Sequence, residues 1–153
     1  LAHFLDDPLL VSMPYRQHPV VIFANKKHPL ARYKSVKLSR LHDEPMIVRE
    51  EGSTTRKSFE DACKRHGVTP KLMMAIGSRE AIREAVIKGV GLSIVSEAEY
   101  VADPEITMIR ISDADIYTNA HVVCLRDRKE ARIIRAFLDI AMNIQHVMRA
   151  ATP

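Results

Sequence analysis

The stretch PMIVREEGSTTRKSFEDACKRHGV, residues 45–68, passes from an apolar run into an amphipathic helix and decides the fold class. Residues 45–49 are apolar and partly β-branched, which predicts a short strand. Behind them, Phe59 and Cys63 recur at helical spacing, and Gly67 stands where a helix end favours a positive φ. A strand followed by a helix of more than about ten residues is the repeating unit of an α/β domain.

The same order recurs directly after this stretch. Residues 71–76 predict a strand, Gly77 a turn and Ser78 the N-cap of a helix over residues 79–88. Further strands are predicted at residues 9–13, 19–26, 92–95, 106–111 and 120–126. Strands that alternate with helices predict an α/β domain with a mainly parallel sheet, and Met73 and Met74 are expected in its core.

The C-terminal part of the chain is expected to hold a short helix and a long one. Ser96 and Glu99 have the spacing of a capping box, which predicts a short helix. Residues 129–148 predict a long amphipathic helix. The apolar residues of its expected buried stripe are Ile133, Ile134, Phe137, Leu138, Ala141 and Ile144.

Composition is that of an ordinary globular domain: 46% of the 153 residues are hydrophobic and 27% charged, which excludes a disordered or fibrous chain. The net charge of +4 is spread along the chain, so no nucleic-acid footprint is predicted within it. Cys63 and Cys124 are interpreted as small buried thiols in a reducing, cytoplasmic compartment. No apolar run approaches the roughly 18 residues of a membrane span, and no signal peptide is predicted at Leu1, before which we expect more chain.

Motifs for catalysis, cofactors and metals are not found. The sequence contains neither a P-loop nor a nucleophile elbow. Gly89 and Gly91 form a G-x-G that precedes a strand, so a helix end with a tight turn explains them better than a nucleotide loop. The seven histidines show no short metal-ligand spacing. The sequence therefore predicts neither an enzyme nor a metal or cofactor site.

Hydroxyl residues stand in a row where the helix after residue 49 begins: Ser53, Thr54 and Thr55. Capping alone explains them, because Ser and Thr are preferred N-caps. A helix start also carries unpaired amides and a partial positive charge that bind small anions, and Arg49 and Arg56 lie nearby in sequence. Ser78 opens a second helix on what is expected to be the same sheet edge. Spacing alone leaves both interpretations open, a cap only and a cap that also binds an anion.

Larger segments carry a family pattern: FANKKHPLA (23–31), LHDEPMIVREEGSTTR (41–56), SREAIREAVIKGVGLSIVSE (78–97) and VVCLRDR with ARIIRAFLDIAM (122–142). In this order they resemble the effector-binding domain of LysR-type transcriptional regulators. The resemblance implies a type 2 periplasmic-binding-protein-like fold, with two α/β subdomains around a small-molecule cleft. It also implies effector-binding residues, namely Ser53, Thr54, Thr55 and Ser78, with Arg49 and Arg56 as further candidates.

The resemblance also implies how the chain is organised. Residues 1–43 and 119–153 correspond to the later part of an incomplete first subdomain, and residues 44–118 to the second, with crossings near 43–45 and 117–120. The helix-turn-helix of the family has no counterpart here, so DNA binding is expected only through an N-terminal part outside this chain. The bare sheet edge of an incomplete subdomain favours a homodimer or larger assembly. No membrane partner is expected.

Three functions remain to be weighed. The first is a sensor that binds a small anionic metabolite, a phosphonate or a carboxylate, and thereby modulates DNA binding. The second is the solute-binding protein of a transporter, which shares the architecture; the third, an enzyme on this fold, lacks any supporting motif. Three segments most resemble regulators associated with aminoethylphosphonate catabolism: GSTTRKSFEDA (52–62), IGSREAIREAV (76–86) and VSEAEY (95–100).

Overall fold

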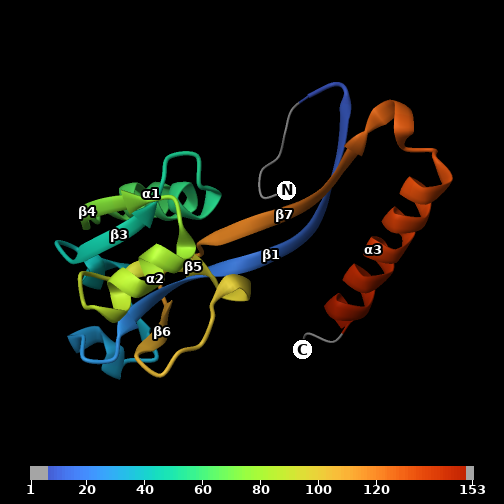
Figure 1. Ribbon diagram of the computed structural model, residues 1–153. Helices are drawn as coiled ribbons and strands as arrows, with labels where there is room; N and C mark the ends of the chain where they lie inside the picture. The colour runs from blue at the N-terminus through green and yellow to red at the C-terminus, as the bar shows by residue number, and fades with distance from the viewer. Residues whose placement is uncertain (1–6, 151–153) are drawn as a thin grey trace. The chain divides into compact units, whose positions relative to one another are not determined.

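The chain forms two compact units in a computed structural model that describes residues 7–150, with side chains through residue 145. Unit 1 contains the residues up to Gln17 together with those from Asn119 onward, and unit 2 contains His18–Thr118. Strands β1 (Leu10–Asn25) and β7 (Tyr117–Leu125) contribute residues to both units. Figure 1 shows the order of the elements along the chain.

The larger sheet is built around β1 and is not mainly parallel. β1 pairs antiparallel with β5 (Ser93–Ser96) and β6 (Ile106–Ile111), while β2 (Ser35–Val36) pairs parallel with β6. β7 also pairs with β1. The prediction of a mainly parallel sheet is therefore wrong for the strands next to β1, and the two strands expected at 9–13 and 19–26 are one continuous strand.

A second, two-stranded sheet carries the helices of unit 2. β3 (Pro45–Arg49) and β4 (Lys71–Ile76) run parallel, as the strand–helix–strand order predicts. Leu92, just before β5, lies beside β3: the Ile47 amide donates to the Leu92 carbonyl and the Leu92 amide to the Pro45 carbonyl, both at 2.8 Å. The fold is therefore mixed α/β, as predicted.

Helices α1 (Thr54–His66) and α2 (Arg79–Ile87) begin and end where the sequence predicts, to within a residue. Ser53 caps α1, and Gly67 ends it with a φ of 65° in the left-handed region. There the Val68 amide donates to the Cys63 carbonyl at 2.9 Å. Ser78 caps α2. Each end is closed by bonds between near neighbours in sequence, which is why local patterns predict it.

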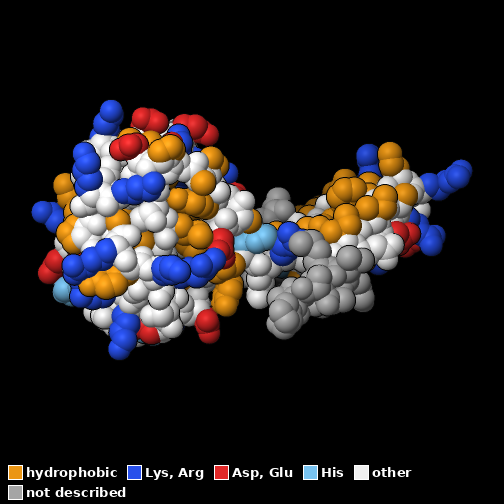
Figure 2. Space-filling view, turned by 90° about the horizontal axis from the view of Figure 1, so that it is seen from below, with side chains coloured by type: hydrophobic (Ala, Val, Ile, Leu, Met, Phe, Trp, Pro, Cys, Tyr) orange, Lys and Arg blue, Asp and Glu red, His pale blue; other side chains and the backbone are white. Residues whose placement is uncertain are grey.

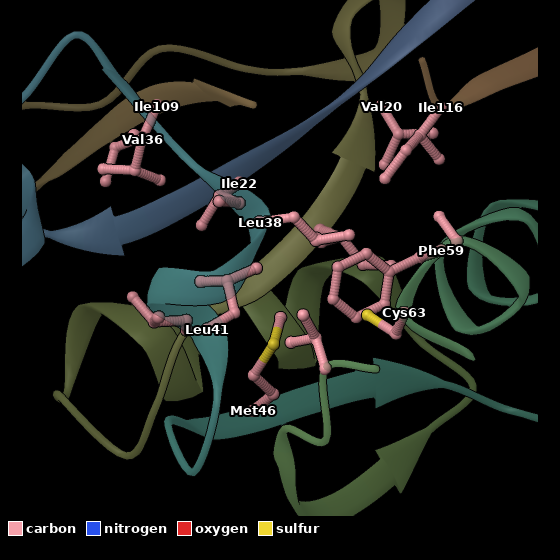
Figure 3. Packing of buried hydrophobic residues seen from close by; sticks show 14 of the residues in the cluster. Val20, Ile22, Val36, Leu38, Leu41, Met46, Phe59, Cys63, Ile109 and Ile116 are labelled. Atoms are coloured by element: carbon pink, nitrogen blue, oxygen red, sulfur yellow. The ribbon is translucent and has the colours of Figure 1, made fainter. Parts of the chain in front are cut away.

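The two helices cover opposite sides of the strands (Figure 1). Phe59 of α1 belongs to the larger buried cluster, with Ile22 of β1 and Met46 of β3. The next residue along each of these strands points the other way, so Phe23 and Ile47 pack in a second cluster with Ile82 of α2. Figure 3 shows Phe59 and Cys63 projecting from α1 into the larger cluster.

Short 3-10 turns connect these elements: η1 (Pro29–Arg32), η2 (Leu38–Leu41), η3 (Glu97–Glu99) and η4 (Arg126–Arg128). The capping box predicted at Ser96 and Glu99 is not formed, because the Ser96 side chain caps nothing. Its hydroxyl is buried and instead lies 3.3 Å from the hydroxyl of Thr118 at the start of β7. A contact between strands has replaced the local one.

Unit 1 contains a helix whose apolar stripe is only partly covered. α3 (Arg132–Ala150) begins three residues later than predicted. Leu138 and Ala141 are buried, whereas Ile133, Phe137 and Ile144 are exposed, Phe137 by 59%. Figure 2 shows a run of hydrophobic side chains on this part of the molecule. The predicted burial of the stripe is therefore correct only at its centre.

The edge strand β4 also departs from expectation. Met73 and Met74 were predicted in the core but are 46% and 43% exposed. Within residues 7–150, β4 pairs only with β3, so no second strand shields these side chains. The hydrophobicity of Met73 and Met74 predicted that they are buried, but they are exposed because β4 lies at the edge of its sheet.

Unit 2 begins earlier than the predicted second subdomain. The resemblance places residues 18–43 in the first subdomain, and in the structure these residues belong to unit 2. Leu30, Leu38 and Leu41 pack in the same buried cluster as Phe59. The correspondence of these units to the two subdomains of the family stays a prediction.

Burial also determines the chemistry of Cys63. Desolvation, assisted by the nearby charge of Glu60, raises the pKa of its thiol to about 11 from the ordinary 9.0. At pH 8 the thiolate fraction is then about 0.1% instead of about 10%. In a Cys124→Ser variant, where Cys63 is the sole thiol, we expect iodoacetamide to alkylate the folded chain about 100-fold more slowly than the urea-unfolded chain. Mass spectrometry over time measures both rates, and equal rates would contradict the described burial.

Candidate functional site

The starts of α1 and α2 lie at one edge of the β3–β4 sheet. β3 and β4 are parallel, and Arg49 at the end of β3 is opposite Ile76 at the end of β4. α1 begins after β3 and α2 after β4, so both helix starts follow the carboxyl ends of neighbouring strands. This is the edge at which α/β folds place their ligands.

Ser53 and Ser78 act as caps. The Ser53 hydroxyl accepts from the Arg56 amide at 3.4 Å, and the Ser78 hydroxyl accepts from the Ala81 amide at 3.2 Å. Ser78 also donates to the Glu80 carboxylate at 2.9 Å. Glu80's own backbone amide, followed by the Ser78 hydroxyl, lowers the pKa of that carboxyl. Both hydroxyls are therefore already engaged within the protein.

Thr54 and Thr55 occupy the first turn of α1 and are partly exposed. Among the described residues, neither threonine side chain has a recorded hydrogen-bond partner, in contrast to Ser53. Their hydroxyls are available to a ligand at the positive end of the helix.

The two predicted arginines differ in how firmly they are held. Arg56 is bound on two sides: its Nε lies 2.7 Å from Glu60, and its Nη1 donates to the Arg49 carbonyl at 3.0 Å. Arg49 makes two 2.7 Å bonds to the carboxylate of the adjacent Glu50. This contact lowers the pKa of Glu50 to about 2 and raises that of Arg49. Arg56 thus supports the end of β3, while Arg49 faces a partner that is itself half exposed.

A pocket of about 530 Å³ opens in unit 2 beside these helix starts. Of the predicted residues, Arg49 and Thr55 line it; Ser53, Thr54, Ser78 and Arg56 do not. Arg79 at the start of α2 joins them. Most of the remaining lining is apolar, including Phe23, Ile82, Ile94, Val95, Val101 and Ile106.

Sequence reasoning missed several lining residues as site candidates. Arg79 forms an ion pair with Glu99 at 2.8 Å, and Arg83 pairs with Asp103. Tyr100 lines the same pocket, and burial raises the pKa of its hydroxyl. The position of Arg79 directly after Ser78 was a usable signal. No sequence feature marked Glu99 and Tyr100 as site candidates, because only the order of strands in the sheet brings the segment after β5 next to α2.

The described part of the chain offers neither a metal-ligand cluster nor a membrane-spanning helix. There, no three or more His, Cys, Asp or Glu side chains gather as they would around a metal ion. No helix among those residues is long and apolar enough to cross a membrane. On the face of unit 2 in Figure 2, Lys and Arg are scattered between apolar side chains.

Sequence comparison identifies the family. Residues 1–143 match the model of the LysR substrate binding domain. The HTH-type transcriptional activator CmpR of Synechocystis is 29% identical over 153 residues, which cover 91% of this chain and 50% of that protein. A RuBisCO operon transcriptional regulator of Acidithiobacillus ferrooxidans is 37% identical over 94 residues, covering 61% of this chain and 30% of the relative. This chain therefore spans half or less of the length of these relatives.

Solved structures agree with this assignment. The regulatory domain of CcmR from Synechocystis PCC6803, in complex with 2-PG, is 30% identical with a TM-score of 0.81, and the match covers 95% of this chain and 71% of that one. The effector binding domain of QuiR, in complex with shikimate, shares the fold at 19% identity, with a TM-score of 0.80 and coverage of 95% and 69%. The chain belongs to the LysR substrate-binding domain family, the effector-binding part of LysR-type transcriptional regulators.

Proposed function

We propose that this chain senses a small anionic metabolite, which it binds at the starts of α1 and α2, and that binding modulates DNA binding by another part of the regulator. The observation that carries the proposal is the pocket in which Arg49, Thr55 and Arg79 meet. Two helix N-termini, two guanidinium groups and the Thr55 hydroxyl supply hydrogen-bond donors for an anion, which would compete with Glu50 and Glu99 for Arg49 and Arg79.

Relatives support small-molecule sensing. The CcmR regulatory domain and the QuiR effector binding domain are described as complexes with 2-PG and with shikimate, respectively. The curated relatives are named as transcriptional regulators, which favours this function over a transporter's solute-binding protein or an enzyme.

The finer features remain part of the proposal. DNA binding is assigned to an N-terminal part outside this chain, a homodimer or larger assembly is expected, and the cytoplasm is the expected location. The sequences of residues 52–62 and 76–86 resemble those of regulators associated with aminoethylphosphonate catabolism. This resemblance supports aminoethylphosphonate, or another small phosphonate or carboxylate, as the effector. A single helix start of this kind serves phosphonate and carboxylate groups alike.

Replacing both Thr54 and Thr55 by Val tests the site. Val keeps the shape of Thr but removes the hydroxyl, so anion binding should weaken at least about tenfold while stability changes little. Titration calorimetry on the complete protein measures affinity for acetate, inorganic phosphate, methylphosphonate and 2-aminoethylphosphonate. Thermal unfolding measures stability.

The matched control is Thr69→Val. Thr69 is exposed and precedes β4, so it lies at the amino end of that strand, away from the edge where α1 and α2 begin. Among the described residues, only its backbone makes hydrogen bonds. This variant should bind as the unmodified protein does. If the Thr54/Thr55 variant retains the affinity of the control, the α1 start is a cap only and the proposed site is wrong.

A further inference from the structure

The pocket of unit 2 is larger and more apolar than a small hydrophilic anion requires. Its volume is about 530 Å³. At about 30 Å³ per water-sized group, this is room for roughly 18 non-hydrogen atoms. Pockets of about 300–1,000 Å³ with mostly apolar walls are typical of organic ligands of that size.

The apolar wall comes from four different elements. Phe23 of β1, Ile82 of α2, Ile94 of β5 and Ile106 of β6 all line the pocket. Each is part of the buried core, so their positions are determined by packing on both sides. They are only 3–6% exposed and form the floor of the pocket, while Val101, 64% exposed, adds further apolar surface at its side. A ligand that offered only charged and hydroxyl groups would leave this surface in contact with water, which is unfavourable.

Charged groups gather at the rim. Arg79 is 56% exposed and pairs with Glu99, whose carboxylate is 39% exposed. Exposed pairs of this kind contribute little to stability, so a ligand anion could replace Glu99 at small cost. Arg49 is held more firmly, because its side chain is 21% exposed and makes two 2.7 Å bonds to the carboxylate of Glu50.

Arg83 also lines the pocket, but its guanidinium is engaged within the protein. The Nε of Arg83 is buried, and no hydrogen bond to it is recorded among the described residues. The other end of this guanidinium is held by Asp103, a largely buried carboxylate. Because the Nε nitrogen is buried, it does not face the open pocket, and the anionic group of a ligand would meet Arg79 and Arg49 instead.

We propose that this pocket binds an organic anion carrying an apolar ring or branched chain, with the anionic group at Arg79 and Arg49 and the apolar body against Phe23, Ile82 and Ile106. The inference rests on the proposed function, since it assigns a ligand class to the same region. Among small phosphonates and carboxylates, it favours those with a larger apolar body over 2-aminoethylphosphonate, whose two carbons would occupy the rim and leave the apolar wall unfilled.

Phenylphosphonate and methylphosphonate test the inference, because they share the anionic group and differ in the apolar body. Calorimetry on the complete protein should show phenylphosphonate binding at least about tenfold more tightly than methylphosphonate. Arg79→Gln should weaken both probes about tenfold or more. Arg65→Gln is the matched control: it removes the same charge from the exposed last turn of α1, outside the pocket lining, and should leave both affinities unchanged.

A second variant locates the apolar body. Val101 lines the pocket and is 64% exposed, so Val101→Phe fills part of the pocket without disturbing the core. It should remove the advantage of phenylphosphonate over methylphosphonate. Equal affinities for the two probes in the unmodified protein, or an advantage that survives Val101→Phe, would overturn the inference.

The proposed function is judged separately by the Thr54/Thr55 variant. If methylphosphonate binding depends on those threonines and phenylphosphonate has no advantage, only the ligand class is wrong. If neither probe binds, and the acetate, phosphate and aminoethylphosphonate panel is also silent, the proposed function and the inference both fail.

Discussion

Replacing Gly91 by Ala is expected to lower the free energy of unfolding by about 3 kcal/mol. A Cβ at this position would lie 2.6 Å from the Pro45 carbonyl oxygen and 3.1 Å from its carbon, both backbone atoms that cannot rotate away. The same carbonyl accepts the 2.8 Å hydrogen bond from the Leu92 amide. A methyl group there must therefore push β3 away from Leu92 and break the contact that holds β3 beside the start of β5.

Gly77→Ala is the matched control for Gly91. Gly77 also stands at a turn of unit 2, but the nearest atom to its added Cβ is the Glu50 Oε2 at 4.0 Å, an ordinary contact distance. Urea unfolding followed by circular dichroism should show a lower midpoint for Gly91→Ala and little change for Gly77→Ala. A similar midpoint for both variants would mean that β3 does not pack against Gly91 as described.

Replacing Phe59 by Ala should cost about 3–5 kcal/mol, the range for removing a buried aromatic side chain. Phe59 is 1% exposed and packs in the larger buried cluster with residues of β1, β3 and η2 (Figure 3). Its loss leaves a cavity between α1 and the strands that these elements cannot readily close. Because α1 also carries Thr54 and Thr55, loosening this helix should weaken anion binding as well.

Unfolding in urea measures the Phe59 effect. Phe59→Leu, which retains most of the apolar volume, should lose clearly less stability than Phe59→Ala. Lys57→Ala on the same helix should change stability by less than about 0.5 kcal/mol, because Lys57 is exposed and its 3.8 Å pair with Asp61 lies at the surface. Equal losses at positions 57 and 59 would contradict the described packing of α1.

Arg49, Arg56 and Thr55 were all predicted to bind the ligand, but the structure gives them different contacts. Their nearness to a helix start was readable from the chain, but their roles were not. Arg56 is occupied by Glu60 and by the Arg49 carbonyl, whereas Arg49 and Thr55 line the pocket. These differences depend on where each side chain points, which depends on neighbours in space.

By itself, the sequence determined the helix starts and ends, the mixed α/β class and the family resemblance. Caps such as Ser53 and Ser78 bond to amides three residues away, and Gly67 terminates α1 through its own φ, so these features need no distant partner. Only the tertiary structure decided the antiparallel pairing of β1, the exposure of Met73 and Met74, and the pocket itself. Each of these requires segments far apart in the chain to meet, and the free energy of such contacts depends on which strands become neighbours.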